Sequence, residues 1–193
     1  IRTSLYSGVS TAISLLVRLI SNKIIAVYLG TSGIFLLGQL KDFLRLSNVI
    51  SGFGIENGII KYTSEFQKSD EELRKILSTS FRTHLFFSLI FCILILIFKN
   101  TIAEYLLLDF DSKFYFLILS ISVISFSIHT LLMSIINGIK KIKLYVTINI
   151  VSVVISAILM ITLVLKYAII GALYALIINQ ITTLLVTLIL FYI

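Results

Sequence analysis

Residues 144–165 read LYVTINIVSVVISAILMITLVL, an apolar run without a formal charge. A helix of about 20 residues, rising 1.5 Å per residue, crosses the ~30 Å hydrocarbon core of a bilayer. This run therefore predicts a transmembrane helix. Comparable runs recur along the chain and predict an all-α integral membrane protein with six spans at about 5–29, 34–62, 78–98, 114–136, 144–165 and 169–193.

The composition agrees with this class of protein. Of the 193 residues, 59% are hydrophobic and 13% are charged, whereas soluble domains carry about 25% charged residues. The net charge of +7 does not require nucleic acid, because Lys and Arg in loops set the orientation of membrane proteins. Cys92 is the single cysteine, and His84 and His129 form no cluster, so we expect no disulfide, metal site or cofactor.

Lys and Arg are distributed unevenly between the two sets of loops. Eight lie after the second and fourth predicted spans, within residues 61–82 and 138–143, and Arg2 adds one more on that side. Only three follow the first, third and fifth spans: Lys99, Lys113 and Lys166. Because cytoplasmic loops carry the excess of positive charge, we expect the N-terminus and the two basic loops to be cytoplasmic.

The first two predicted spans differ from the other four because charged residues interrupt them. A cation at the centre of the bilayer costs about 2.5–3.5 kcal/mol even on the mildest scale, so such residues usually face a cavity or a partner. Several of them lie within an arc of about 120° on the second span. The sequence therefore predicts a polar transport pathway lined by Arg18, Lys23, Lys41, Asp42, Arg45 and Glu56.

These charged residues also have structural explanations, which the sequence leaves open. Lys41, Asp42 and Arg45 are close enough in sequence to form a local ion pair near the outer surface. Lys23 is near enough to the end of its helix to reach the interface with its long side chain. Arg18 lies deeper, where an ion pair with Glu56 or Asp42 would neutralise it.

Polar residues in the last three spans are weaker candidates. Serines, amides and His129 on these helices more often join transmembrane helices than bind a solute. No G-x-x-x-x-G-K-[ST] motif is present in the sequence, so ATP hydrolysis would need another subunit.

Several motifs closely resemble the start of bacterial O-antigen and enterobacterial-common-antigen flippases. Those proteins have K-x-x-A-x-x-x-G at the end of helix one and G-x-G-x-x-N-G-x-x-K-Y in helix two. The corresponding stretches here are NKIIAVYLG at 22–30, GQLKD at 38–42 and SGFGIENGIIKY at 51–62, with further similarity at 70–75 and 137–141. The resemblance implies membership of the multidrug/oligosaccharidyl-lipid/polysaccharide exporter superfamily. It also implies one six-helix lobe, the N-terminal half, of a MATE-like twelve-helix transporter whose C-terminal lobe is missing here.

The resemblance further implies a function. We expect a flippase, not an enzyme, that moves oligosaccharides linked to undecaprenyl diphosphate across the bacterial inner membrane for O-antigen or surface polysaccharide biosynthesis. Transport would proceed by alternating access coupled to a proton or sodium ion. Membrane lipid and possible polysaccharide polymerases are the expected partners, with no nucleic acid. Substrate binding is assigned to Arg18, Lys23, Lys41 and Arg45, and ion coupling to Glu56 and Asp42.

Three other functions compete with this interpretation. A MATE-type multidrug or small-molecule antiporter for cations would line its cavity with acids, but bases outnumber acids four to two in the charged spans. A membrane polysaccharide polymerase is less compatible with the short outer loops. A scaffold without transport activity would not need deep charges.

Overall fold

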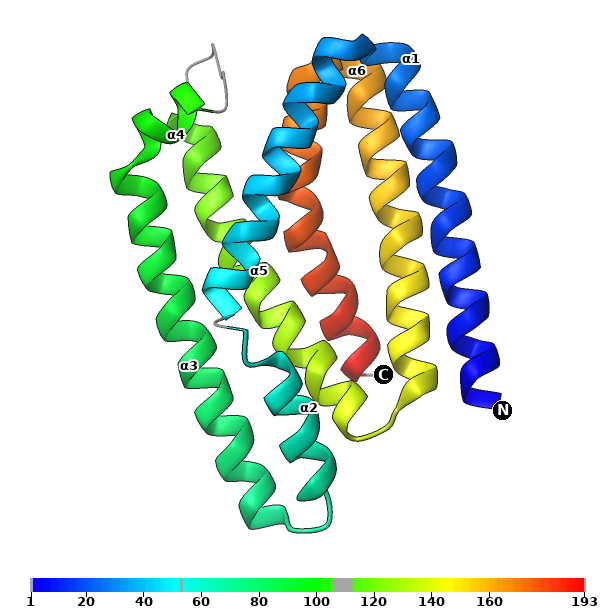
Figure 1. Cartoon of the computed structure of the whole chain (residues 1–193), viewed down its shortest axis with the longest axis vertical. Helices are drawn as coiled ribbons and strands as arrows, with labels where there is room; N and C mark the ends of the chain where they lie inside the picture. Colours follow the sequence, from blue (N-terminus) through cyan, green and yellow to red (C-terminus); the bar gives the residue numbers. More distant parts are fainter. Residues whose placement is uncertain (1, 53, 106–112, 193) are drawn as a thin grey trace.

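The structure, a computed structural model, describes residues 2–52, 54–105 and 113–192. Every secondary-structure element in these residues is an α-helix. Figure 1 shows long helices running side by side along one axis. The elements in chain order are α1 (Arg2–Gly52), α2 (Glu56–Glu65), α3 (Asp70–Ile97), α4 (Lys99–Tyr105), α5 (Lys113–Gly138) and α6 (Ile142–Tyr192).

Among the described residues, four helices are long and apolar enough to cross a membrane, and the all-helical class is confirmed. They are Gly8–Gly52, Asp70–Ile97, Phe114–Gly138 and Ile142–Tyr192. The first and last of these each consist of two arms, because the backbone leaves helical geometry at Gly30 (φ 65°) and at Ala168 (φ 48°). In Figure 1 both helices, α1 and α6, fold back sharply at these points. The six-span lobe itself stays a prediction.

The stretch predicted as one span at 34–62 is broken in the structure. α1 ends at Gly52 and α2 begins at Glu56. Gly54 lies between them with a φ of 64°, in the left-handed region that only glycine adopts without strain. A run of apolar residues indicates length and burial, but it does not show where a positive φ interrupts the helix.

The start of α3 follows the sequence closely. Ser69 is the N-cap residue in an extended conformation, and three acids occupy the first turn, where the helix dipole favours negative charge. The polar segment between the spans predicted at 78–98 and 114–136 begins with the short helix α4, and residues 106–112 lie outside the described residues.

The apolar core lies where α5 meets its neighbours. α5 packs against α1, α2, α3 and α6. Tyr115 and Phe116 of α5 are fully buried, together with Leu40 of α1, Ile95 of α3 and Ile177 of α6. The arms of α1 and α6 contribute residues to this core and also pack against each other.

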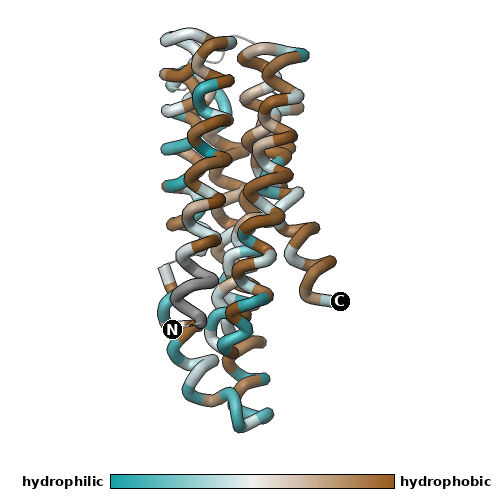
Figure 2. The backbone as a smooth tube through the Cα atoms, turned by 90° about the vertical axis from the view of Figure 1, so that its right-hand side faces the viewer, coloured by the Kyte–Doolittle hydropathy of each residue, from teal (hydrophilic) through white to brown (hydrophobic). Residues whose placement is uncertain are grey.

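The basic loops share one end of the bundle. The N-terminus, the α2–α3 turn and the α5–α6 turn all lie at the lower end in Figure 1, whereas the turns within α1 and α6 and helix α4 lie at the upper end. Figure 2 shows many hydrophilic residues at the lower end, with others higher along the helices. The loops that were grouped by their Lys and Arg content are therefore on the same side of the molecule.

Candidate functional site

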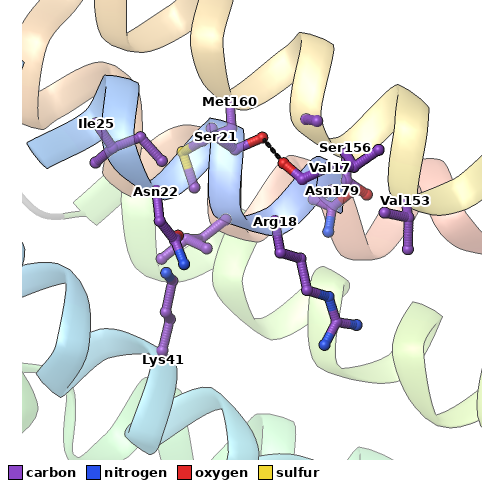
Figure 3. A pocket seen from close by; sticks show the side chains of 13 residues that line it. Val17, Arg18, Ser21, Asn22, Ile25, Lys41, Val153, Ser156, Met160 and Asn179 are labelled. Carbon is purple, nitrogen blue, oxygen red and sulfur yellow. Dashed lines mark hydrogen bonds between the residues drawn. The ribbon is translucent and has the colours of Figure 1, made fainter. Parts of the chain in front are cut away.

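Two adjoining cavities lie between the arms of α1 and α6. The first has a volume of about 220 Å³ and is lined by residues of both α1 arms and both α6 arms. Figure 3 shows Arg18 and Asn22 projecting from the first arm of α1, with Lys41 approaching from the second arm. Ser156 and Asn179 line the same cavity from the two arms of α6.

The second cavity, of about 450 Å³, continues from the first along the second arm of α1. The two cavities share Lys41, Leu176 and Asn179. We call their union the α1–α6 groove. The remaining polar residues that line its second part are Arg45, Asn48, Glu56, Gln180 and Thr183.

Helical spacing explains why these residues share the groove. Arg18, Asn22 and Ile25 lie at i, i+4 and i+7, so they occupy one face of the first α1 arm. Lys41 and Arg45 are likewise four residues apart on the second arm. The turn at Gly30 folds the second arm back, and this brings the two cationic faces to the same groove.

Four of the six charged residues predicted for the pathway line the groove: Arg18, Lys41, Arg45 and Glu56. Lys23 is exposed and lines neither cavity. Asp42 also lies outside the lining, and its carboxylate is 3.4 Å from the Arg45 guanidinium. The exposed fractions of these two side chains, 72% for Asp42 and 79% for Arg45, mean that the pair contributes at most about 1 kcal/mol.

The groove is cationic overall. Three basic side chains and one carboxylate line it. Neither Arg18, Lys41 nor Glu56 forms an ion pair with any residue that the structure describes. The positive charge of the groove is therefore not neutralised from within, and the arrangement is suited to an anionic ligand. Arg supplies planar, bidentate hydrogen bonding to phosphate oxygens, and Lys supplies a point charge.

Amide and hydroxyl side chains on α6 form the rest of the polar lining. Sequence reasoning treated them as residues that join helices, and one contact agrees: the Ser156 hydroxyl bonds to the Asn179 side-chain oxygen and connects the two α6 arms. The same residues also border the groove, which sequence reasoning missed. The spacing of Asn179, Gln180 and Thr183 at i, i+1 and i+4, which places three polar side chains on one face of the helix, could have indicated this lining.

The two histidines are held by hydroxyl groups on neighbouring helices. His84 Nδ1 of α3 lies 3.0 Å from Ser127 Oγ of α5, and His129 Nδ1 of α5 lies 2.7 Å from Thr187 Oγ1 of α6. His129 is thus a packed polar residue between helices. Within the described ranges, no group of three or more His, Cys, Asp or Glu is placed to hold a metal ion.

Comparisons with known proteins identify the family of the chain. Residues 33–193 match the family described as "Polysaccharide biosynthesis protein". The Lipid III flippase of Escherichia coli (strain K12) is 26% identical over 103 residues, which is 53% of this chain and 25% of that protein. The Lipid III flippase of Shigella flexneri matches to the same extent. No solved structure matches significantly.

Proposed function

Because this chain belongs to the polysaccharide biosynthesis protein family, we propose that it forms part of a flippase for lipid-linked oligosaccharides in the bacterial inner membrane. The observation that carries the proposal is the cationic α1–α6 groove. The match to Lipid III flippases supports it, although the aligned region covers only a quarter of those proteins.

Different parts of the groove and its surroundings would contact different chemical parts of such a substrate. Arg18, Lys41 and Arg45 attract the diphosphate, since opposite charges 4 Å apart attract by about 4 kcal/mol at an effective dielectric constant of 20. The amides and hydroxyls on α6 offer hydrogen bonds to sugar hydroxyls. The polyprenyl chain remains against the exposed apolar surface of the helices, where Leu15, Leu19 and similar residues face outward.

Alternating access would carry the diphosphate from the cytoplasmic to the periplasmic side. Glu56 is the carboxylate in the groove, and we assign to it the coupling of transport to a proton or sodium ion. Lys23 and Asp42 do not line the groove, so the proposal rests on the other four charged residues.

Binding experiments distinguish this function from its main competitor. The purified chain in lipid nanodiscs should bind undecaprenyl diphosphate at least tenfold more tightly than undecaprenol, because the alcohol has no charge for the groove cations. Binding should weaken as salt increases. Equal affinity for diphosphate and alcohol would contradict the proposal, and tight binding of cationic dyes would favour a MATE-type antiporter.

We also propose that the N-terminus and the loops at 66–69 and 139–141 face the cytoplasm. The excess of Lys and Arg at that end of the bundle supports this orientation. In a Cys92→Ser background, a cysteine at position 70 should react with an impermeant maleimide only after the membrane is opened. A cysteine at position 31, next to Gly30 at the turn between the two arms of α1, should react in intact spheroplasts. The reverse pattern would overturn the orientation.

A further inference from the structure

A buried histidine lies beside the groove carboxylate. A methyl group placed on Gly52 would be 3.5 Å from His84 Cε1 and 3.6 Å from Glu56 Oε1. Both side chains therefore border the same small space next to Gly52, at the end of the second α1 arm. Glu56 opens to the groove, whereas His84 is 1% exposed.

The imidazole of His84 is only half satisfied. Its Nδ1 is 3.0 Å from Ser127 Oγ, and its Nε2 is buried without a hydrogen-bond partner in the described part of the chain. An unpaired buried polar atom costs about 1–3 kcal/mol. When Nδ1–H donates to Ser127, Nε2 carries a free lone pair that accepts a proton.

The break between α1 and α2 gives Glu56 a way to reach His84. Glu56 is the first residue of α2, and Gly54 precedes it with a φ of 64°. Rotation about this glycine would reorient the first turn of α2. Gly52 has no side chain to separate the carboxylate from the imidazole.

We propose that His84 and Glu56 form a proton-binding pair beside Gly52, which takes up one proton from the groove when an anionic ligand occupies the cations. The proton binds His84 Nε2, and the resulting imidazolium pairs with the Glu56 carboxylate. The charge of the pair changes from −1 to 0, and the proton is the only species added. The pair itself is a property of this chain; only its coupling to transport rests on the proposed function.

The electrostatic surroundings favour this exchange. Arg45 and Lys41 of α1 line the groove together with Glu56. A bound diphosphate would neutralise these cations and repel the carboxylate, which favours its movement towards His84.

Other titratable groups on elements packed against α3 are placed differently. His129 of α5 bonds to Thr187 of α6, so it is committed elsewhere. α4, which carries Lys99 and Glu104, lies at the upper end of the bundle. The exposed groups closest in sequence to the pair are Lys61 and Glu65 of α2 and Arg82 of α3.

The test is the titration of His84 by NMR of the ¹⁵N-histidine-labelled chain in detergent micelles. The chain has two histidines, and His129→Gln assigns their signals. In Glu56→Gln the midpoint pH of His84 should fall by at least one unit, a tenfold loss of proton affinity. Glu65→Gln, which removes an exposed acid from the same helix, should leave it unchanged. Equal midpoints in the parent chain and Glu56→Gln would overturn the proposal.

A second variant guards against misfolding of Glu56→Gln. Gly52→Ala keeps both titrating groups but places a methyl group at ordinary contact distance from each of them, which hinders their approach, so it should also lower the His84 midpoint. An unchanged midpoint in Gly52→Ala, with the His129 signal as a folding control, would count against the pair.

The ligand provides an independent readout. Undecaprenyl diphosphate added to a weakly buffered sample should cause proton uptake in the parent chain and none in His84→Gln. Ligand binding without uptake in the parent chain would overturn the pair and leave the flippase proposal intact. A Glu56-dependent His84 titration without ligand binding would retain the pair and overturn the flippase proposal.

Discussion

Arg18→Ala is expected to abolish surface glycan assembly while the protein still inserts and accumulates in the membrane. Arg18 projects into the groove from the first α1 arm and has no ion-pair partner among the described residues. Its removal takes away the one guanidinium of the first cavity. Since charge-assisted hydrogen bonds contribute about 1.5–3 kcal/mol, ligand affinity should fall by about 10- to 100-fold.

The measurement combines complementation of a flippase-deficient strain with ligand binding to the purified variant. Arg18→Lys should retain part of the activity, because it keeps the charge but not the bidentate geometry. Lys166→Ala is the matched control, since Lys166 is an exposed cation beside the turn in α6. Normal glycan and normal affinity in Arg18→Ala would exclude a binding role for this residue.

Gly171→Ala is expected to have the largest effect on stability. Gly171 is buried just after the turn in α6 and packs against the preceding arm. A methyl group there would lie 2.6 Å from the backbone carbonyl carbon of Leu163 and 3.0 Å from Tyr167 Cβ. Backbone atoms cannot move aside as a flexible side chain does, so the two α6 arms must separate. The cost should reach the upper part of the ~1–3 kcal/mol range for overpacking, or exceed it.

Thermal unfolding in detergent, followed by loss of the monodisperse peak in size-exclusion chromatography, measures this effect. Gly38→Ala serves as the control, because Gly38 lies within a helix and no atom lies within 4 Å of its added methyl group. Both variants gain the same helix propensity, and they differ only in the space available. If Gly171→Ala unfolds at the same temperature as Gly38→Ala, the close packing of the α6 arms is contradicted.

The motifs in the first two spans were sufficient to predict the family. The resemblance to bacterial flippases is confirmed by the match of residues 33–193 and by the similarity to Lipid III flippases. The turn between the spans predicted at 5–29 and 34–62 is present, because Gly30 takes the positive φ that glycine adopts without strain. The turn between the spans predicted at 144–165 and 169–193 is present as well, but its positive φ falls on an alanine, Ala168, and not on a glycine.

The separation of the charged residues into lining and non-lining positions was not predictable. The helical arc of the second span included Asp42 together with Lys41 and Arg45, but Asp42 is held outside the groove in a pair with Arg45. Sequence analysis also missed that His84 and Glu56 both lie next to Gly52. His84 and Glu56 belong to different helices, and their distance depends on how α3 packs against α1.

Sequence alone determined the helical class, the membrane-spanning character and the excess of cations, because each depends on the residue types within about 20 consecutive positions. Tertiary structure alone decided which cations share a groove. Arg18 and Lys41 meet Asn179 only because the turns at Gly30 and Ala168 reverse α1 and α6 and pack their arms together. Hydrophobic periodicity specifies which face of a helix is buried, but the neighbour that covers this face is selected by long-range packing.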